Sequence, residues 1–322
     1  MSDKPQRQVF GEELVALGAA NEKLVVLDAD VSSSTQTKLF GAAYPDRFFN
    51  VGIAEANMAS VAAGLAASGY VPVISTFALF MSLKAGDQIR AQIAYPRLHV
   101  IMAGGYAGLS DFADGASHQS VEDLAVMRAI PGITVVAPCD ATETKLAIRA
   151  AIATDGPVFL RLSRESVPEL FKEQSHPFEL GKGVVVEEGE DVTLVATGTM
   201  LSVALVARNE LARSGVSARV VDMHTVKPLD ADLVEKAARQ TGAIVTIEEH
   251  TIHGGLGSAV CEAVCERFPV PVVRVGIPDR FGESGAYAQI LARAGLDALS
   301  VAGAARRACE MKSGSTARRG GA

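Results

Sequence analysis

The segment FFNVGIAEANMASVAAGLAASG, residues 48–69, followed directly by YVPVIST, residues 70–76, decides the fold class. A short strand-like run leads through Gly52 into an Ala-rich stretch of helical spacing that opens with Glu55, and a second aliphatic run comes after it. A strand, a helix and another strand in this order predict a βαβ unit with parallel strands. Because the helix dipole favours a carboxylate in the first turn, Glu55 alone fits an ordinary helix start.

The same alternation continues through residues 1–170. Aliphatic runs bounded by Gly, Pro or Asp lie at residues 24–28, 71–76, 98–102, 133–137 and 157–162, and Ala-rich helical stretches separate them. This pattern predicts an α/β domain, with a mostly parallel sheet flanked by helices.

A second α/β domain is predicted after a break in the pattern. Residues 166–183 are polar, contain two prolines and have no clear period, and we place an interdomain linker at 171–184. Strand-like runs at 192–197, 218–225, 243–250 and 270–276 alternate with helical stretches and define a domain over 185–312. Residues 313–322 are small, polar and basic, which predicts a disordered tail.

Composition excludes several classes of function. Of 322 residues, 48% are hydrophobic, enough for a sizeable core, and the net charge of −7 argues against nucleic acid as the main partner. No apolar run approaches the roughly 20 residues that span a bilayer. Four cysteines and no secretory signal predict a cytoplasmic protein, and Cys261 and Cys265 lack the further ligands that a metal site needs.

Three motifs carry a resemblance to the transketolase family. VGIAEANM (residues 51–58) is similar to the signature of its pyrimidine-binding domain, STFALF (75–80) resembles the segment that packs on the cofactor, and DGASHQ (114–119) matches an element that reaches the sugar. The resemblance runs from Arg7 to about Cys309 and corresponds to the last two domains of the family.

The resemblance implies thiamine diphosphate as cofactor. Glu55 would be the catalytic carboxyl that contacts the aminopyrimidine ring and activates the cofactor. Phe77 and Phe80 would pack on that ring, and Asp30 would lie near the cofactor and the subunit interface. Leu83 stands where many members have a third aromatic residue.

The resemblance also implies a sugar-phosphate site. Asp114 and His118 would contact the ketose near its reacting carbonyl, with His118 as a second catalytic residue. Arg7, Ser34 and Arg164 match the phosphate end, where guanidinium groups suit a terminal phosphate. Tyr106 replaces a phosphate-binding histidine and brings no positive charge, which puts the usual sugar-phosphate preference in doubt.

The second domain resembles the C-terminal domain shared by transketolases and the beta subunits of 2-oxoacid dehydrogenases. TIEEHTIHGGLGSAVCEAV, residues 246–264, carries this similarity. His250 and His253 are three residues apart, so a metal pair is conceivable, but loop or interface positions suit them better.

The sequence has no Gly-Asp-Gly motif. In transketolases that motif and a later Asn hold the diphosphate through Mg²⁺, a cation that prefers hard oxygen ligands. The resemblance therefore implies a separate N-terminal subunit that carries the motif and the Mg²⁺, most simply in an assembly with two of each chain.

Three alternatives stay open at this point. A dehydrogenase beta subunit shares both domains and the glutamate, although STFALF and RLSRESVP (residues 161–168) look closer to sugar-phosphate enzymes. A non-catalytic subunit that only stabilises its partner is a second alternative, and a deoxyxylulose-phosphate synthase is a weaker one. The preferred prediction is a transketolase subunit that moves a two-carbon ketol unit in pentose phosphate metabolism or in specialised sugar catabolism such as that of apulose 4-phosphate.

Overall fold

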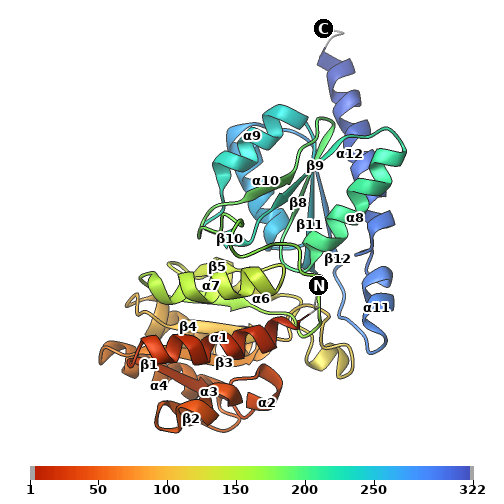
Figure 1. The fold of residues 1–322 in the computed structure, drawn as a ribbon. Helices are drawn as coiled ribbons and strands as arrows, with labels where there is room; N and C mark the ends of the chain where they lie inside the picture. Colours follow the sequence, from red (N-terminus) through yellow and green to blue (C-terminus); the bar gives the residue numbers. More distant parts are fainter. Residues whose placement is uncertain (1–3, 320–322) are drawn as a thin grey trace.

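Two helix-covered sheets make up the computed structural model, which describes residues 4–319 and their side chains through residue 314 (Figure 1). The first sheet has the strand order β10-β5-β6-β4-β3-β1-β2, and all its strands are parallel except β10. Its strands are β1 (Leu24–Asp28), β2 (Phe48–Asn50), β3 (Val71–Phe77), β4 (Ile101–Gly105), β5 (Thr134–Val136), β6 (Val158–Arg161) and β10 (Thr225–Lys227).

Helices cover both faces of this sheet because its strands are aliphatic on both sides. One face packs against α1 (Gln6–Ala20), α3 (Lys38–Ala43) and α7 (Ala141–Ala153). The other packs against α4 (Glu55–Ala67), the π-helical segments η2 (Phe80–Lys84) and η3 (Ile89–Ala94), and α6 (Asp123–Ala129). Shorter pieces are α2 (Ser32–Thr35), α5 (Gly86–Gln88), η1 (Pro45–Arg47) and η4 (Gly115–Ser117).

The second sheet has the order β12-β11-β8-β9-β7, with β7 antiparallel to β9. Its strands are β7 (Val184–Glu187), β8 (Val192–Ala196), β9 (Ala218–Asp222), β11 (Ile244–Thr251) and β12 (Val272–Ile277). Its helices are α8 (Met200–Arg213), α9 (Ala231–Thr241), α10 (Leu256–Arg267), α11 (Tyr287–Arg293) and α12 (Ala298–Arg319). The two predicted α/β units, each with a mostly parallel sheet, are confirmed.

One hydrophobic core is continuous between the two units. Side chains of α4 and α6 in the first unit belong to the same buried cluster as side chains of α9 and α10 in the second. The chain also crosses the boundary at β10, which pairs antiparallel with β5 and so joins the first sheet. The two units are therefore built as one packed body.

Several predicted boundaries differ from the structure. The run at 98–102 becomes β4 at Ile101–Gly105, and the run at 218–225 divides into β9 and the separate strand β10. Residues 162–183 have no helix or strand, but the last predicted linker residue, Val184, begins β7. The predicted disordered tail is helical through Arg319, because α12 continues into it, and its residues 320–322 lie outside the described part of the chain.

Across residues 4–319, none of the helices combines the length and apolar character that crossing a membrane requires.

Candidate active site

The carboxyl ends of the strands in the first sheet bring most of the predicted residues to one edge. Asp30 follows β1, Phe77 ends β3, Tyr106 follows β4 and Arg164 lies three residues after β6. Ligands of open parallel sheets bind at this edge, where the loops leave the strands side by side. Asp30 and Tyr106 also have φ angles of 65° and 57°, which are uncommon for non-glycine residues.

Glu55 is the first residue of α4, with 5% of its surface exposed. Gly52, at φ 73°, turns the chain between β2 and this helix. The Glu55 Oε1 atom lies 3.2 Å from the ammonium of Lys84, whose side chain is half-exposed. The ion-pair partner of this buried carboxylate is therefore a half-exposed lysine side chain, which a ligand could displace.

An aromatic face lies at the same edge. The Phe77 ring stacks on Tyr106 at a centroid distance of 4.3 Å and on Phe80 at 5.7 Å. His118 meets the Phe80 ring edge-on at 5.4 Å, and the Lys84 Nζ atom lies 4.0 Å from the centroid of that ring. The structure therefore brings three of the predicted cofactor residues, Glu55, Phe77 and Phe80, into one cluster with two predicted sugar residues, Tyr106 and His118.

Lys84 was missed by the sequence reasoning. It follows the half-exposed Leu83 in a helical stretch, where a lysine is ordinarily a solvated surface charge. Its position between the carboxylate of Glu55 and the ring of Phe80 becomes visible only when η2 folds against α4.

Two arginines flank Tyr106. Arg7 donates from Nη1 to the Tyr106 hydroxyl at 2.9 Å and to the Ser34 carbonyl at 3.1 Å. Arg164 lies 5.1 Å from the centroid of the Tyr106 ring and pairs with Asp111 at 2.9 Å. The four residues predicted for the phosphate end therefore lie close together: Arg7, Ser34, Tyr106 and Arg164. Ser34 contacts Arg7 through its backbone carbonyl and not through its hydroxyl.

Gln6 fixes the start of α1 and with it Arg7. The fully buried side-chain amide of Gln6 donates to the Pro138 carbonyl at 2.6 Å and accepts from the Ser163 N–H at 2.7 Å. Because Ser163 adjoins Arg164, one buried amide sets the spacing of both arginines.

The loop at residues 108–120 carries Asp114 and His118. Asp114 is exposed, and the half-buried His118 contacts the Ser117 hydroxyl through Nδ1 at 2.9 Å. Asp111, which the sequence reasoning missed, is buried; burial raises its pKa, nearby Asp114 raises it further, and Arg164 lowers it. A free carboxylate oxygen of Asp111 is buried without a hydrogen-bond partner among the described residues.

Asp30 lies at the exposed rim, where its carboxylate accepts from the Asn50 side chain at 2.8 Å. The buried Asp28, which was not predicted as a site residue, holds this loop in place. Its carboxylate accepts from the Val31 N–H at 2.7 Å and from the Thr37 hydroxyl at 2.7 Å. Burial raises the pKa of Asp28, and these hydrogen bonds oppose the shift.

His250 lies at the boundary between the two units. Its Nε2 accepts from the Ala125 N–H at the start of α6 at 3.2 Å, and burial lowers its pKa to about 4. His253 is exposed beside it. Within residues 4–319, the side chains that converge closely enough to hold a metal are instead Cys139, Glu143 and Asp222, all buried.

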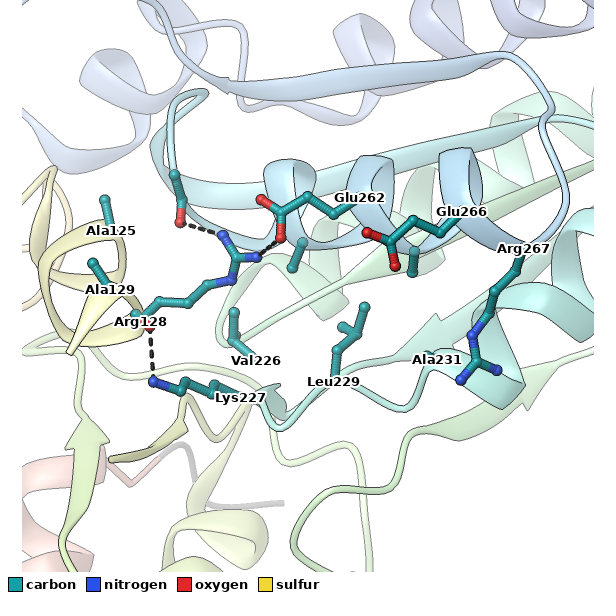
Figure 2. Close-up of a pocket in the computed structure, with 13 residues that line it drawn as sticks. Ala125, Arg128, Ala129, Val226, Lys227, Leu229, Ala231, Glu262, Glu266 and Arg267 are labelled. Atoms are coloured by element: carbon teal, nitrogen blue, oxygen red, sulfur yellow. Dashed lines mark hydrogen bonds and ion pairs between the residues drawn. The ribbon is translucent and has the colours of Figure 1, made fainter. Parts of the chain in front are cut away.

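A pocket of about 560 Å³ lies between α6 and α10 (Figure 2), and Phe77, Phe80 and Tyr106 are not among its lining residues. Arg128 pairs there with Glu262 and the Gly254 carbonyl, and Lys227 donates to the Arg128 carbonyl at 2.9 Å. The predicted site residues do not line it. The side chains of Arg128 and Lys227 already have partners within the chain. Because α6 of the first unit and α10 of the second both line the pocket, it is part of the boundary between the two units.

Family models match the two units separately. Residues 4–169 match the transketolase pyrimidine-binding domain and residues 181–301 match the transketolase C-terminal domain. The chain belongs to the transketolase family. It has the two domains that form the C-terminal subunit of split transketolases.

Similar transketolase chains have nearly the same length. A putative transketolase C-terminal section from Methanocaldococcus jannaschii is 44% identical over 93% of this chain and 94% of its own. The 6-deoxy-6-sulfo-D-fructose transketolase subunit SqwH of Clostridium sp. is 41% identical over 95% of each chain. A split-gene transketolase solved as an inactive β4 tetramer is 48% identical and superposes with a TM-score of 0.90, over 96% of this chain and 99% of that one.

The pyrimidine-binding domain implies thiamine diphosphate, and the described residues fit its ring. Phe77 and Phe80 present two nearly parallel rings, 23° apart, and the Lys84 ammonium links Phe80 to the buried Glu55 carboxylate. A flat heteroaromatic ring could stack on these phenyl groups and hydrogen-bond to that carboxylate.

Proposed function

We propose that this chain is the catalytic C-terminal half of an enzyme that moves a two-carbon ketol unit from an anionic ketose to an aldose. The observation that carries the proposal is the buried carboxylate of Glu55 beside the aromatic face of Phe77 and Phe80, in a chain without Gly-Asp-Gly. Such a site offers the ring-binding part of a thiamine diphosphate site and leaves the diphosphate to another chain.

Thiamine diphosphate, when bound, supplies the carbon nucleophile that takes up the ketol unit. In this proposal Glu55 shares a proton with a nitrogen of the cofactor's pyrimidine, and Phe77 and Phe80 orient the ring. His118, next to Phe80, exchanges a proton with the sugar near the reacting carbonyl, and Asp114 binds a hydroxyl group. Displacement of Lys84 from Glu55 would open the carboxylate to the ring.

The partner in this proposal is an N-terminal subunit that holds the diphosphate through Mg²⁺ at Gly-Asp-Gly and Asn. Two of each chain is the simplest assembly that closes two such sites. The split-gene relative is inactive as a tetramer of beta chains, which supports the need for a second type of chain. Exposed apolar side chains at Ile53 and Phe49, next to Glu55, support a subunit contact there, with Asp30 at its rim.

The anionic end of the sugar would lie at Arg7, Ser34, Tyr106 and Arg164. Asp111 neutralises part of the charge of Arg164, and the Tyr106 hydroxyl accepts a hydrogen bond from Arg7 without adding charge. Both a sugar phosphate and a sugar sulfonate fit two guanidinium groups. One relative is named for a sulfosugar, and another, from Phocaeicola vulgatus and 35% identical over 90% of this chain, for apulose 4-phosphate.

The close relatives named as transketolase subunits favour this activity over that of a 2-oxoacid dehydrogenase beta subunit. The intact pair of Glu55 and the aromatic face argues against a silent stabilising subunit.

The test is reconstitution with the partner subunit that carries Gly-Asp-Gly. The wild-type complex with thiamine diphosphate and Mg²⁺ should release an aldose from a ketose phosphate or from 6-deoxy-6-sulfo-D-fructose in the presence of an aldose acceptor. Glu55→Gln should lower kcat by about 10²–10⁴-fold, the usual contribution of a positioned acid–base group.

The matched control is Glu12→Gln, because Glu12 lies on the surface of α1 and pairs only loosely with Lys4 at 3.2 Å. Its kcat should equal that of the wild type. A Glu55→Gln complex as active as the wild type would show a silent subunit, and oxidative decarboxylation of a 2-oxoacid in place of ketol transfer would favour the dehydrogenase alternative.

A further inference from the structure

The loop at residues 108–120 is closed at its base by backbone hydrogen bonds. The Gly108 N–H donates to the Ser120 carbonyl at 2.9 Å, and the Ser120 N–H donates back at 3.0 Å. The residues between them include Asp111, Asp114 and His118. Whatever fixes the base of this loop therefore fixes the direction in which these side chains point.

Glu249, on β11 of the second domain, reaches across the boundary to this base. Its Oε1 accepts from the Leu109 N–H at 2.7 Å, and its Oε2 accepts from the hydroxyls of Thr199 at 3.0 Å and Tyr287 at 2.8 Å. The carboxylate is buried, and each of these three donors is neutral. A hydrogen bond to a buried charged acceptor is stronger than one between neutral groups.

The backbone of Glu249 is tied to the other end of the loop. Arg161 Nη2 donates to the Glu249 carbonyl at 2.9 Å and to the Ser120 carbonyl at 3.3 Å, while the same guanidinium pairs with buried Asp123 at 2.7 Å. Glu249 thus contacts the start of the loop through its side chain and the end of the loop through Arg161.

Glycine is required at position 108 for the carboxylate of Glu249 to sit where it does. Gly108 has φ 63°, and a Cβ atom there would lie 2.6 Å from the Glu249 carboxyl carbon. The left-handed backbone and the missing side chain are both needed for the carboxylate to reach the Leu109 N–H.

A second contact holds the outer part of the loop. The connection between β12 and α11 extends from the second domain towards the first (Figure 1), where the Gly285 N–H donates to the Phe112 carbonyl at 3.0 Å. Gln119 donates from its side chain to the Glu283 carbonyl at 3.0 Å. The second domain therefore contacts the loop at its base and along its length.

We propose that Glu249 is a positioning residue: through the Leu109 N–H it sets the geometry of the loop that presents Asp114 and His118 to the ketose. The second domain then contributes to donor binding without touching the sugar. The inference rests on the proposed function for the role of the loop, but the contact itself can be tested separately.

Hydrogen–deuterium exchange of the full-length chain tests the contact without any activity. In Glu249→Ala, amides in residues 108–120 should exchange about tenfold faster or more, the size expected when a hydrogen bond to a charged acceptor is lost. Glu248→Gln is the matched control: Glu248 is equally buried on the same strand but accepts from the Leu256 and Gly257 N–H groups of α10. It should leave the exchange of the loop unchanged.

The reconstituted complex tests the role. Glu249→Ala should raise the KM for the donor ketose about tenfold or more, as expected for a misplaced binding group. The affinity for thiamine diphosphate should stay within twofold of the wild type. Glu249→Gln, which keeps one acceptor oxygen for Leu109, should restore most of the donor affinity.

Unchanged loop exchange in Glu249→Ala would overturn the inference. If the alanine variant does not fold, Glu249→Asp replaces it, because its side chain is one methylene too short to reach the Leu109 N–H, and unchanged loop exchange there would overturn the inference in the same way. Faster exchange with an unchanged donor KM would overturn it as well, because the loop would then not position the donor. If the wild-type complex transfers no ketol unit, the proposed function fails, and the exchange experiment still decides whether Glu249 holds the loop.

Discussion

The carboxyl ends of the strands carry polar side chains in both sheets, but the two edges face different surroundings. In the first sheet this edge is open, with exposed Asp30 and Asp114 and half-exposed Lys84. In the second sheet the corresponding residues at the ends of β9 and β11, which include Asp222 and Glu249, are buried against the first domain.

The comparison shows that polar residues at strand ends are not enough to make an active site. At the buried edge, Glu248 and Glu249 are satisfied by backbone N–H groups and hydroxyls, and His250 accepts a backbone N–H. At the open edge, the partner of Glu55 within the described part of the chain is the half-exposed side chain of Lys84. The first arrangement docks two domains, and the second leaves a carboxylate available to a ligand.

The largest expected change in stability is at Arg161, the last residue of β6, whose side chain contacts the buried edge through the Glu249 carbonyl. Arg161→Ala would leave the fully buried Asp123 without its 2.7 Å ion-pair partner, so we expect the free energy of unfolding to fall by about 3–5 kcal/mol. Urea unfolding measures this. Arg239→Ala is the control, because Arg239 forms an exposed pair with Glu235 within one helix, worth about 0.3–0.5 kcal/mol. Equal losses in both variants would mean that the boundary is no more tightly held than the surface.

A smaller effect should appear in the pH dependence of stability. Burial raises the pKa of Glu143, on α7 next to Asp222, from 4.5 to about 7. The folded state therefore keeps a proton that the unfolded state has lost, and this stabilisation is present below pH 4.5 and disappears as the pH rises through 7. Between pH 6 and pH 8, ionisation of Glu143 should lower the free energy of unfolding by about 1 kcal/mol.

Glu143→Gln cannot lose that proton, so its unfolding free energy should fall by about 1 kcal/mol less than that of the wild type over the same pH range. Urea unfolding at pH 6 and pH 8 gives the comparison, and Glu22→Gln, at an exposed position, should behave as the wild type does. The same pH response in Glu143→Gln and the wild type would show that another group carries it.

The smallest change in stability should be at the open edge. Lys84→Ala removes the 3.2 Å pair with Glu55, but half of the lysine side chain is exposed, so the free energy of unfolding should change by less than about 1 kcal/mol. Thermal unfolding of the chain alone is the measurement. A loss as large as that of Arg161→Ala would remove the distinction between the two edges.

Much of the fold could be predicted because strand and helix periods are local properties. The aliphatic run at 24–28 becomes β1 without change, and Glu55 begins α4 as expected. The run at 218–225 was predicted as one strand of the second sheet, whereas Thr225 begins β10 of the first; nothing in its own sequence tells which sheet it will join, because that depends on the available edge of β5.

The site residues were predicted from the resemblance and not from local periods. It named Phe77 and Phe80, whose rings stack, and Arg7 and Tyr106, which lie 99 positions apart in the chain and form a hydrogen bond. Lys84, Asp111 and Glu249 were missed because their importance comes from contacts between segments distant in sequence. No local pattern marks a surface lysine or a strand glutamate as a neighbour of a site.

The strand β10 has a consequence for any attempt to study the domains separately. It lies far beyond the first domain in sequence, yet its main chain hydrogen-bonds to β5 of the first sheet. A fragment cut after residue 170 would lack this strand. The unpaired backbone N–H and C=O groups of β5 would then be exposed and could pair with another copy of the fragment. A truncation at this point would therefore disrupt the first sheet, and the two units have to be expressed, purified and mutated as a single piece.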